Sequence, residues 1–183
     1  MTEDNRNVFN PVSKNLFNMN NIYLQQFEEW HLPGTLMWMQ DETLRKDFML
    51  SFIVTSDSHR QWFHRYSEDE SQQIWAIYAD QVHIGNIGLK SIDLIHKKAE
   101  VWIYIGDRTA KCKGIGQTSC RLLFKDLKFQ SFGLHKIYCH VAEWNIASQK
   151  MFLKSGFALE GILKDEMFFE EKFVTLFRFG ILL

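Results

Sequence analysis

The sequence has 183 residues, enough for one domain with a sizeable hydrophobic core. Its 21 basic and 22 acidic residues balance, which argues against a general nucleic-acid-binding protein, because such proteins carry a basic excess. No apolar run reaches the ~18 residues of a membrane span, and no signal-peptide pattern opens the chain. The three cysteines show no metal-ligand spacing, so these features favour a cytoplasmic protein without a metal site.

The first fifty residues give mixed signals. Residues 1–13 are polar and are predicted to form a loose arm, followed by a short strand at 15–19. Residues 21–30 place apolar side chains at roughly helical spacing, which predicts a helix that ends at Pro33-Gly34. Residues 36–52 are apolar but irregular, and no element is assigned to them.

A capped helix and a hairpin follow. Thr55 and Ser56 are both good N-cap residues and predict a helix that runs to Tyr66. Residues 74–79 and 82–89 are apolar runs separated by Asp-Gln, and they predict an antiparallel hairpin.

A glycine-rich loop stands at the centre of the chain. A strand at 99–105 leads into a polar loop that ends in Gly114-Ile115-Gly116, and a helix is predicted from Gln117 to about Phe129. Backbone N–H groups at the start of a helix, with Lys111 and Lys113 beside them, favour a phosphate or pyrophosphate ligand. An ordinary glycine turn before a helix is the alternative, because short glycine motifs are weak signals.

Two nucleotide motifs are excluded. No Gly-x-x-x-x-Gly-Lys-Ser/Thr run exists, and Ser119 replaces the third glycine of the dinucleotide fingerprint.

The C-terminal third completes a mixed sheet. A strand at 136–141 must lie parallel to the strand at 99–105, because a helix crosses between them. Asn145 is a good N-cap for a helix at 146–154, and a long hairpin ends the chain. The element order predicts an α/β domain with a mixed, mostly antiparallel sheet, one parallel strand pair and flanking helices.

Three segments of the sequence resemble the GCN5-related N-acetyltransferase (GNAT) superfamily. They are AEVWIYIGDRTAKCKGIGQ, GLHKIYCHVAEWNIASQKMFLKSGF and EGILKDE. The family's glycine loop, Gln/Arg-x-x-Gly-x-Gly/Ala, binds the pyrophosphate of coenzyme A, and here Lys111 stands at its first position. The resemblance covers residues 74–183. It implies one GNAT domain over 1–183, with acceptor-side helices at 14–73 and the acetyl-CoA-binding core at 74–183.

The resemblance also implies how acetyl-CoA is bound. The parallel strands should splay apart, and the pantetheine arm should lie in the gap. Asn145 has a second interpretation, as a helix cap alone. The implied cofactor-binding residues are Ile103, Ile105, Lys111, Lys113, Gly114, Ile115, Gly116, Gln117, Asn145 and Ser148, with no metal.

Glu100 is the candidate catalytic base. It interrupts an apolar strand, where burial should raise its pKa toward the working range of a base. A surface-facing carboxylate on a half-exposed strand is the alternative.

The general acid is missing from its usual position. Many GNAT relatives carry a tyrosine as general acid at the position of Phe152, which cannot donate a proton. Tyr104, Tyr138 and His140 are candidate substitutes, although each could be a core residue.

The resemblance extends to the acceptor side. The N-terminal third is similar to acetyltransferases of 4-amino sugars in the pseudaminic acid pathway, and implies a small-molecule amine acceptor, a nucleotide-linked amino sugar. The candidate acceptor residues, which could equally be core, are Trp30, His31, His59 and Trp62. Ribosomal-protein N-terminal acetyltransferases share this layout, so a peptide α-amine is the second candidate. A non-catalytic acetyl-CoA-binding module and a homodimer formed through the final hairpin stay open.

Overall fold

The computed structural model describes residues 21–129 and 133–183. The expected arm at 1–13 and strand at 15–19 lie outside these ranges. The described strands are β1 (Ile22–Gln26), β2 (Gln73–Ala79), β3 (Val82–Asp93), β4 (Lys98–Ile105), β5 (Lys136–Ala142), β6 (Ala158–Phe169) and β7 (Lys172–Leu182). The helices are α1 (Leu32–Met39), α2 (Glu42–Asp47), α3 (Ser56–Ser67), α4 (Ile115–Phe129) and α5 (Ile146–Lys154), with 3₁₀ turns η2 (Glu29–His31) and η3 (Arg108–Ala110).

The seven strands form one sheet in the order β1-β2-β3-β4-β5-β7-β6. Only the β4–β5 pair is parallel among the described strands, which confirms the predicted mixed sheet. That pairing joins only three residue pairs, and Glu100 opposite Tyr138 is the last of them. Both strands continue beyond this point, to Ile105 and to Ala142. The predicted splay is therefore present, and it divides the sheet into two parts.

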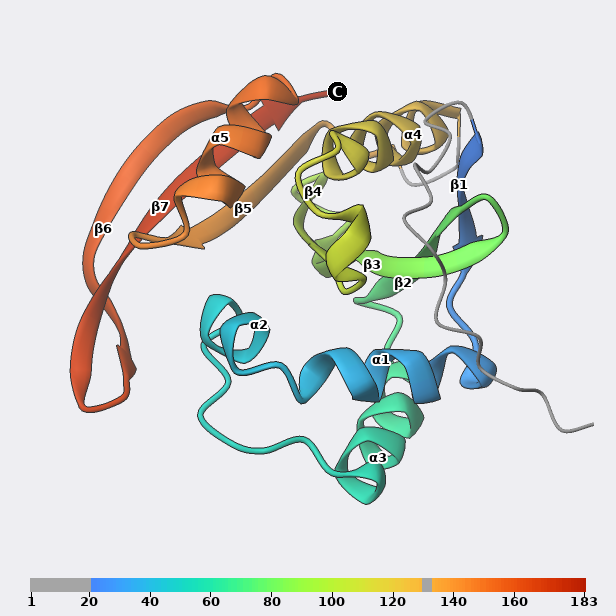
Figure 1. Ribbon diagram of the computed structural model, residues 1–183. Coiled ribbons are helices and arrows are strands. Elements are labelled where there is room, and N and C mark those ends of the chain that lie inside the picture. The colour runs from blue at the N-terminus through green and yellow to red at the C-terminus, as the bar shows by residue number, and fades with distance from the viewer. Residues whose placement is uncertain (1–20, 130–132) are drawn as a thin grey trace, which may run out of the picture.

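The helices cover the two faces of the sheet. Figure 1 shows α4 on one side of the sheet and α1, α2 and α3 on the other. Residues alternate along β4, since successive strand side chains point to opposite faces. Ala99 and Val101 are buried in the core that contains Leu123 of α4. Tyr104 instead packs with Trp38 of α1, so the face that carries Glu100 and Tyr104 belongs to the N-terminal helices.

The helix predicted over residues 21–30 is wrong. Ile22–Gln26 is a strand, and it pairs antiparallel with β2, with Ile22 opposite Ala79. Pro33 lies in the first turn of α1 and begins a helix instead of ending one. A proline is tolerated there, because its missing N–H would have no partner in the first turn. The unassigned residues 36–52 hold the end of α1 and all of α2.

The capped helices are confirmed. Thr55 accepts a hydrogen bond from the Ser58 N–H at the start of α3, and Asn145 accepts one from the Ser148 N–H at the start of α5. α4 begins at Ile115, two residues earlier than predicted. No helix in the described part of the chain is long and apolar enough to cross a membrane.

Candidate active site

A cavity of about 280 Å³ lies where β4 and β5 separate. Both strands contribute to it, β4 through Glu100 and Ile103, and β5 through His140. Asn145 and Ser148, at the start of α5, line the same cavity. Five of the sequence-predicted site residues are thus brought together in one place.

Glu100 is held between two groups that can carry positive charge. Its Oε1 atom lies 3.2 Å from Lys90 Nζ and 3.2 Å from His140 Nδ1. Its side chain is only 13% exposed. Because an ionised carboxylate only accepts hydrogen bonds, the proton of His140 lies on Nδ1 when the ring is neutral. The Nε2 atom of His140 is then an acceptor.

The expected rise in the pKa of Glu100 is wrong. Burial does push this pKa upward, but the hydrogen bond from His140 and the charges of Lys90 and His140 outweigh it. The pKa of Glu100 therefore lies below its ordinary value. An ionised carboxylate of low pKa is a weak base. The arrangement therefore suits Glu100 to orient the His140 ring and to stabilise the positive charge of its protonated form.

Tyr104 does not line the cavity that contains Glu100. Its hydroxyl accepts a hydrogen bond from Asn86 Nδ2 at 2.6 Å, and Asn86 also donates to Thr35 Oγ1 at 3.0 Å. Burial raises the pKa of Tyr104. This hydroxyl is part of a buried polar network, and Tyr104 has no geometry for proton transfer at Glu100.

The glycine loop opens α4 with a left-handed backbone. Cys112 and Gly114 have φ angles of 61° and 77°. The Thr118 N–H donates to the Gly114 carbonyl at 3.0 Å, so the N–H groups of the preceding residues lie in the first turn, where a helix offers no internal acceptor. Lys111 ends the η3 turn just before this loop. A helix N-terminus of this form, next to Lys111, fits a pyrophosphate.

The other predicted loop residues have structural contacts. Ile115 is buried in the main core, so its side chain is not available to a ligand. A Cβ atom at Gly116 would lie 3.4 Å from Met151 of α5, so this glycine lies at the α4–α5 contact. Gln117 Nε2 donates to the Lys154 carbonyl at 2.7 Å, which ties α4 to the end of α5.

Phe152 lines the Glu100 cavity and packs against Phe157 with ring centroids 5.0 Å apart. The position at which the family resemblance implies a tyrosine therefore faces the cavity but has no hydroxyl.

The predicted acceptor residues separate into two pairs. His59 and Trp62 stack at 5.2 Å and line a second cavity of about 340 Å³. Trp30 is 60% exposed, and its Nε1 atom donates to His31 Nε2 at 3.2 Å. His31 is only 2% exposed and also bonds to Tyr78 and to the backbone of Glu28. Neither Trp30 nor His31 lines either cavity.

Three charged residues of the Glu100 cavity were not predicted: Lys90, Asp47 and Glu166. Lys90 is directly opposite Glu100 in the β3–β4 ladder, but the predicted strand stopped one residue short of it. A predicted strand extended by one residue, to 82–90, would have placed Lys90 opposite Glu100. No local signal marks Asp47 or Glu166, because their positions depend on how α2 and β6 pack.

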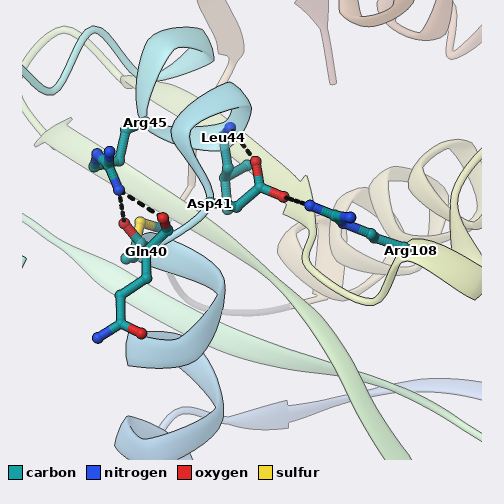
Figure 2. A network of polar contacts seen from close by, with 6 residues as sticks. Gln40, Asp41, Leu44, Arg45 and Arg108 are labelled. Carbon is teal, nitrogen blue, oxygen red and sulfur yellow. Dashed lines mark hydrogen bonds and ion pairs between the residues drawn. The ribbon is translucent and has the colours of Figure 1, made fainter.

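A polar network holds α2 in place beside the cavity (Figure 2). Asp41 accepts from the Leu44 N–H at 3.2 Å, capping α2, and from Arg108 at 2.9 Å. Arg45 donates to the Gln40 carbonyl at 2.7 Å. Asp47, at the end of α2, lines the cavity, and Arg108 links the start of α2 to the segment that precedes the glycine loop. Among the described residues, no cluster of His, Cys, Asp or Glu could hold a metal ion.

The chain resembles known proteins over most of its length. Residues 21–158 match the family model of the acetyltransferase (GNAT) domain. Over 127 residues the chain is 29% identical to the spermidine N(1)-acetyltransferase of Vibrio cholerae, covering 69% of this chain and 72% of that protein. The crystal structure of spermidine N-acetyltransferase from Vibrio cholerae with CoA and spermine matches with a TM-score of 0.78 at 25% identity, covering 89% and 96% of the two chains. RimL, a ribosomal L7/L12 alpha-N-protein acetyltransferase solved with coenzyme A, matches with a TM-score of 0.81 at 15% identity, covering 89% of this chain and 94% of RimL. At this identity the likeness is one of fold.

Proposed function

Because the chain belongs to the GNAT acetyltransferase family and is an acetyl-CoA-dependent N-acetyltransferase, we propose that it acetylates a primary amine of a polyamine by direct transfer in a ternary complex. The observation that carries the proposal is the Glu100 cavity. It combines the Glu100–His140 pair with two further carboxylates, Asp47 and Glu166. A polyamine carries several ammonium groups, and these carboxylates would bind the ones that do not react. The relatives named for spermidine support the same acceptor class.

Two other acceptors have less support. The nucleotide-linked amino sugar was inferred partly from Trp30 and His31, which line neither cavity. The peptide α-amine is suggested by RimL, whose likeness is one of fold. Both acceptors belong in the test panel.

The residues of this chain fit acetyl-CoA. The backbone of β4 at Ile103 and Ile105 faces the gap left by β5, where it would pair with the pantetheine arm. The N-terminus of α4, with Lys111 and Lys113, would hold the pyrophosphate. Asn145 and Ser148, at the start of α5, line the Glu100 cavity. The bound thioester supplies an activated acetyl group.

The Glu100–His140 pair provides the proton acceptor. The His140 Nε2 atom takes the proton of the attacking amine, and the ionised Glu100 fixes the tautomer and stabilises the imidazolium. The C–N bond forms as the thioester C–S bond breaks, and the thiolate leaves without a dedicated acid, since Phe152 has no proton to give.

A thiol-release assay tests the proposal. Acetyl-CoA is combined with spermidine, spermine, UDP- and dTDP-linked amino sugars or short peptides, and the acetylated product is identified by mass spectrometry. We expect saturable release with the polyamines and initial-rate lines that intersect, as direct transfer in a ternary complex requires. Release only with sugars or only with peptides would contradict the polyamine assignment.

A further inference from the structure

A second cavity of about 340 Å³ adjoins the Glu100 cavity. The two cavities share three lining residues: Phe48, Lys90 and Trp102. Because Lys90 also contacts Glu100, the second cavity opens beside the carboxylate of the reacting pair. A substrate whose amine lies at the Glu100–His140 pair can therefore extend into it.

Aromatic side chains line this cavity, and their contacts fix the positions of the rings. The Trp102 ring lies directly over Gly88. A Cβ atom at residue 88 would lie 2.5 Å from this ring, so the observed ring position requires glycine there. The Tyr104 ring is held by its hydrogen bond from Asn86, and its centroid lies 6.0 Å from that of Trp102 in a stacked arrangement. Trp62 stacks on His59.

The charges at this cavity oppose a polyamine. Its only fully charged lining residues are Arg65 and Lys90, and none of the described residues that line it is an aspartate or glutamate. Burial lowers the pKa of His59, so this side chain favours the neutral form. An ammonium group would meet like charge here without a carboxylate partner. An uncharged ring would instead bury apolar surface against five aromatic side chains: Phe48, Phe52, Trp62, Trp102 and Tyr104.

We propose that this cavity binds the ring of a second class of acceptor, primary amines with an aromatic ring two or three carbons from the nitrogen, and that the protein acetylates these amines as well as polyamines. The inference rests on the acetyl transfer proposed above. The bond changes are the same: the amine nitrogen gains the acetyl group as the thioester C–S bond breaks, the amine proton passes to His140, and coenzyme A leaves as the thiolate, which takes a proton from solvent. The two acceptor classes share the amine position and differ in where the rest of the molecule lies.

The test compares 2-phenylethylamine with ethylamine, which has the same amine and no ring, and with spermidine. We expect kcat/KM to be about tenfold or more higher for 2-phenylethylamine than for ethylamine, because a buried ring contributes that much. The variant is Phe52→Ala. Phe52 lines this cavity but not the Glu100 cavity and is 56% exposed, so its removal leaves the core intact.

We expect Phe52→Ala to lower the 2-phenylethylamine rate about threefold or more and to leave the spermidine rate within about twofold. Phe173→Ala is the matched control, since Phe173 is 65% exposed and lines neither cavity. Equal rates with 2-phenylethylamine and ethylamine, while spermidine is acetylated, would overturn this inference and leave the polyamine proposal standing.

If no amine is acetylated, the polyamine proposal fails, and calorimetric titration of the coenzyme A complex with 2-phenylethylamine decides the inference separately. Saturable binding that is weakened by Phe52→Ala supports the cavity as a ring site. Absence of binding overturns it.

Discussion

Glu100 contacts both Lys90 and His140 at the proposed reacting centre. Glu100 stays ionised because the stabilisation by its two partners exceeds the cost of its burial. A low pKa in the folded state contributes stability above the pKa of the unfolded state, and this contribution is lost as the pH falls through the folded-state value. The carboxylate is therefore available to His140 throughout the neutral range.

Replacing Lys90 tests this balance. Lys90→Met removes one positive partner while keeping a long side chain, so the pKa of Glu100 should rise. We expect the acid limb of kcat/KM to move to higher pH, with the rate near pH 8 within about threefold of wild type. The pH–rate profile is the measurement. Lys172→Met, on an exposed hairpin lysine, should leave the limb in place.

His140 can be tested by chemical rescue. His140→Gly should lower kcat by about 10²- to 10⁴-fold, the usual contribution of a general base. Imidazole added to the assay should restore part of the rate, since the space left beside Glu100 can hold it. His135→Gly, at an exposed histidine before β5, should keep the wild-type rate. A His140→Gly variant with full activity would exclude His140 as the base.

At the scale of elements, local signals predicted the capped helices and failed for β1. Thr55 and Asn145 act through neighbours three residues away, so their roles can be read from the sequence. β1 is a strand because Ile22 pairs with Ala79, far along the chain, and no local spacing reports that partner. Tertiary pairing decided the conformation of this segment against its roughly helical spacing.

The turn between α1 and α2 gives a second element-scale test. Asp41→Ala removes the N-cap of α2 and should lower the free energy of unfolding by about 1 kcal/mol. Arg108→Ala breaks only an exposed ion pair and should change it by less than about 0.5 kcal/mol. Urea denaturation of the two variants measures the difference. Equal losses would show that the ion pair, not the cap, holds α2 beside the cavity.

At the scale of the whole molecule, β4 and β5 diverge and divide the sheet into two parts (Figure 1). Three residue pairs join the two strands. The resemblance of two strands and a glycine loop to a known family was enough to predict this gap and to name Glu100 and His140 as separate candidates, but not the contact between their side chains. The walls contributed by Asp47 and Glu166 could not be predicted, because α2 and β6 reach the cavity only through the packing of the complete fold.

A ligand in this gap should stabilise both parts together. At 100 times its dissociation constant, acetyl-CoA should add about 2.7 kcal/mol to the free energy of unfolding, if it binds only the folded state. Thermal denaturation with and without acetyl-CoA measures the shift. Lys111→Ala should reduce the shift at a fixed ligand concentration, because the loop cation is lost. An unchanged melting temperature at saturating acetyl-CoA would contradict binding in the gap.

The most direct test of acetyl transfer at this cavity compares Glu100→Gln with Glu166→Gln. Both changes replace a carboxylate that lines the same cavity, but only Glu100 contacts His140. With spermidine as acceptor and acetyl-CoA affinity measured on the same samples, Glu100→Gln should lower kcat about 100-fold or more with acetyl-CoA affinity preserved. Glu166→Gln should mainly raise the KM for spermidine. Equal kcat values for Glu100→Gln and wild type would contradict the assignment of the reacting centre.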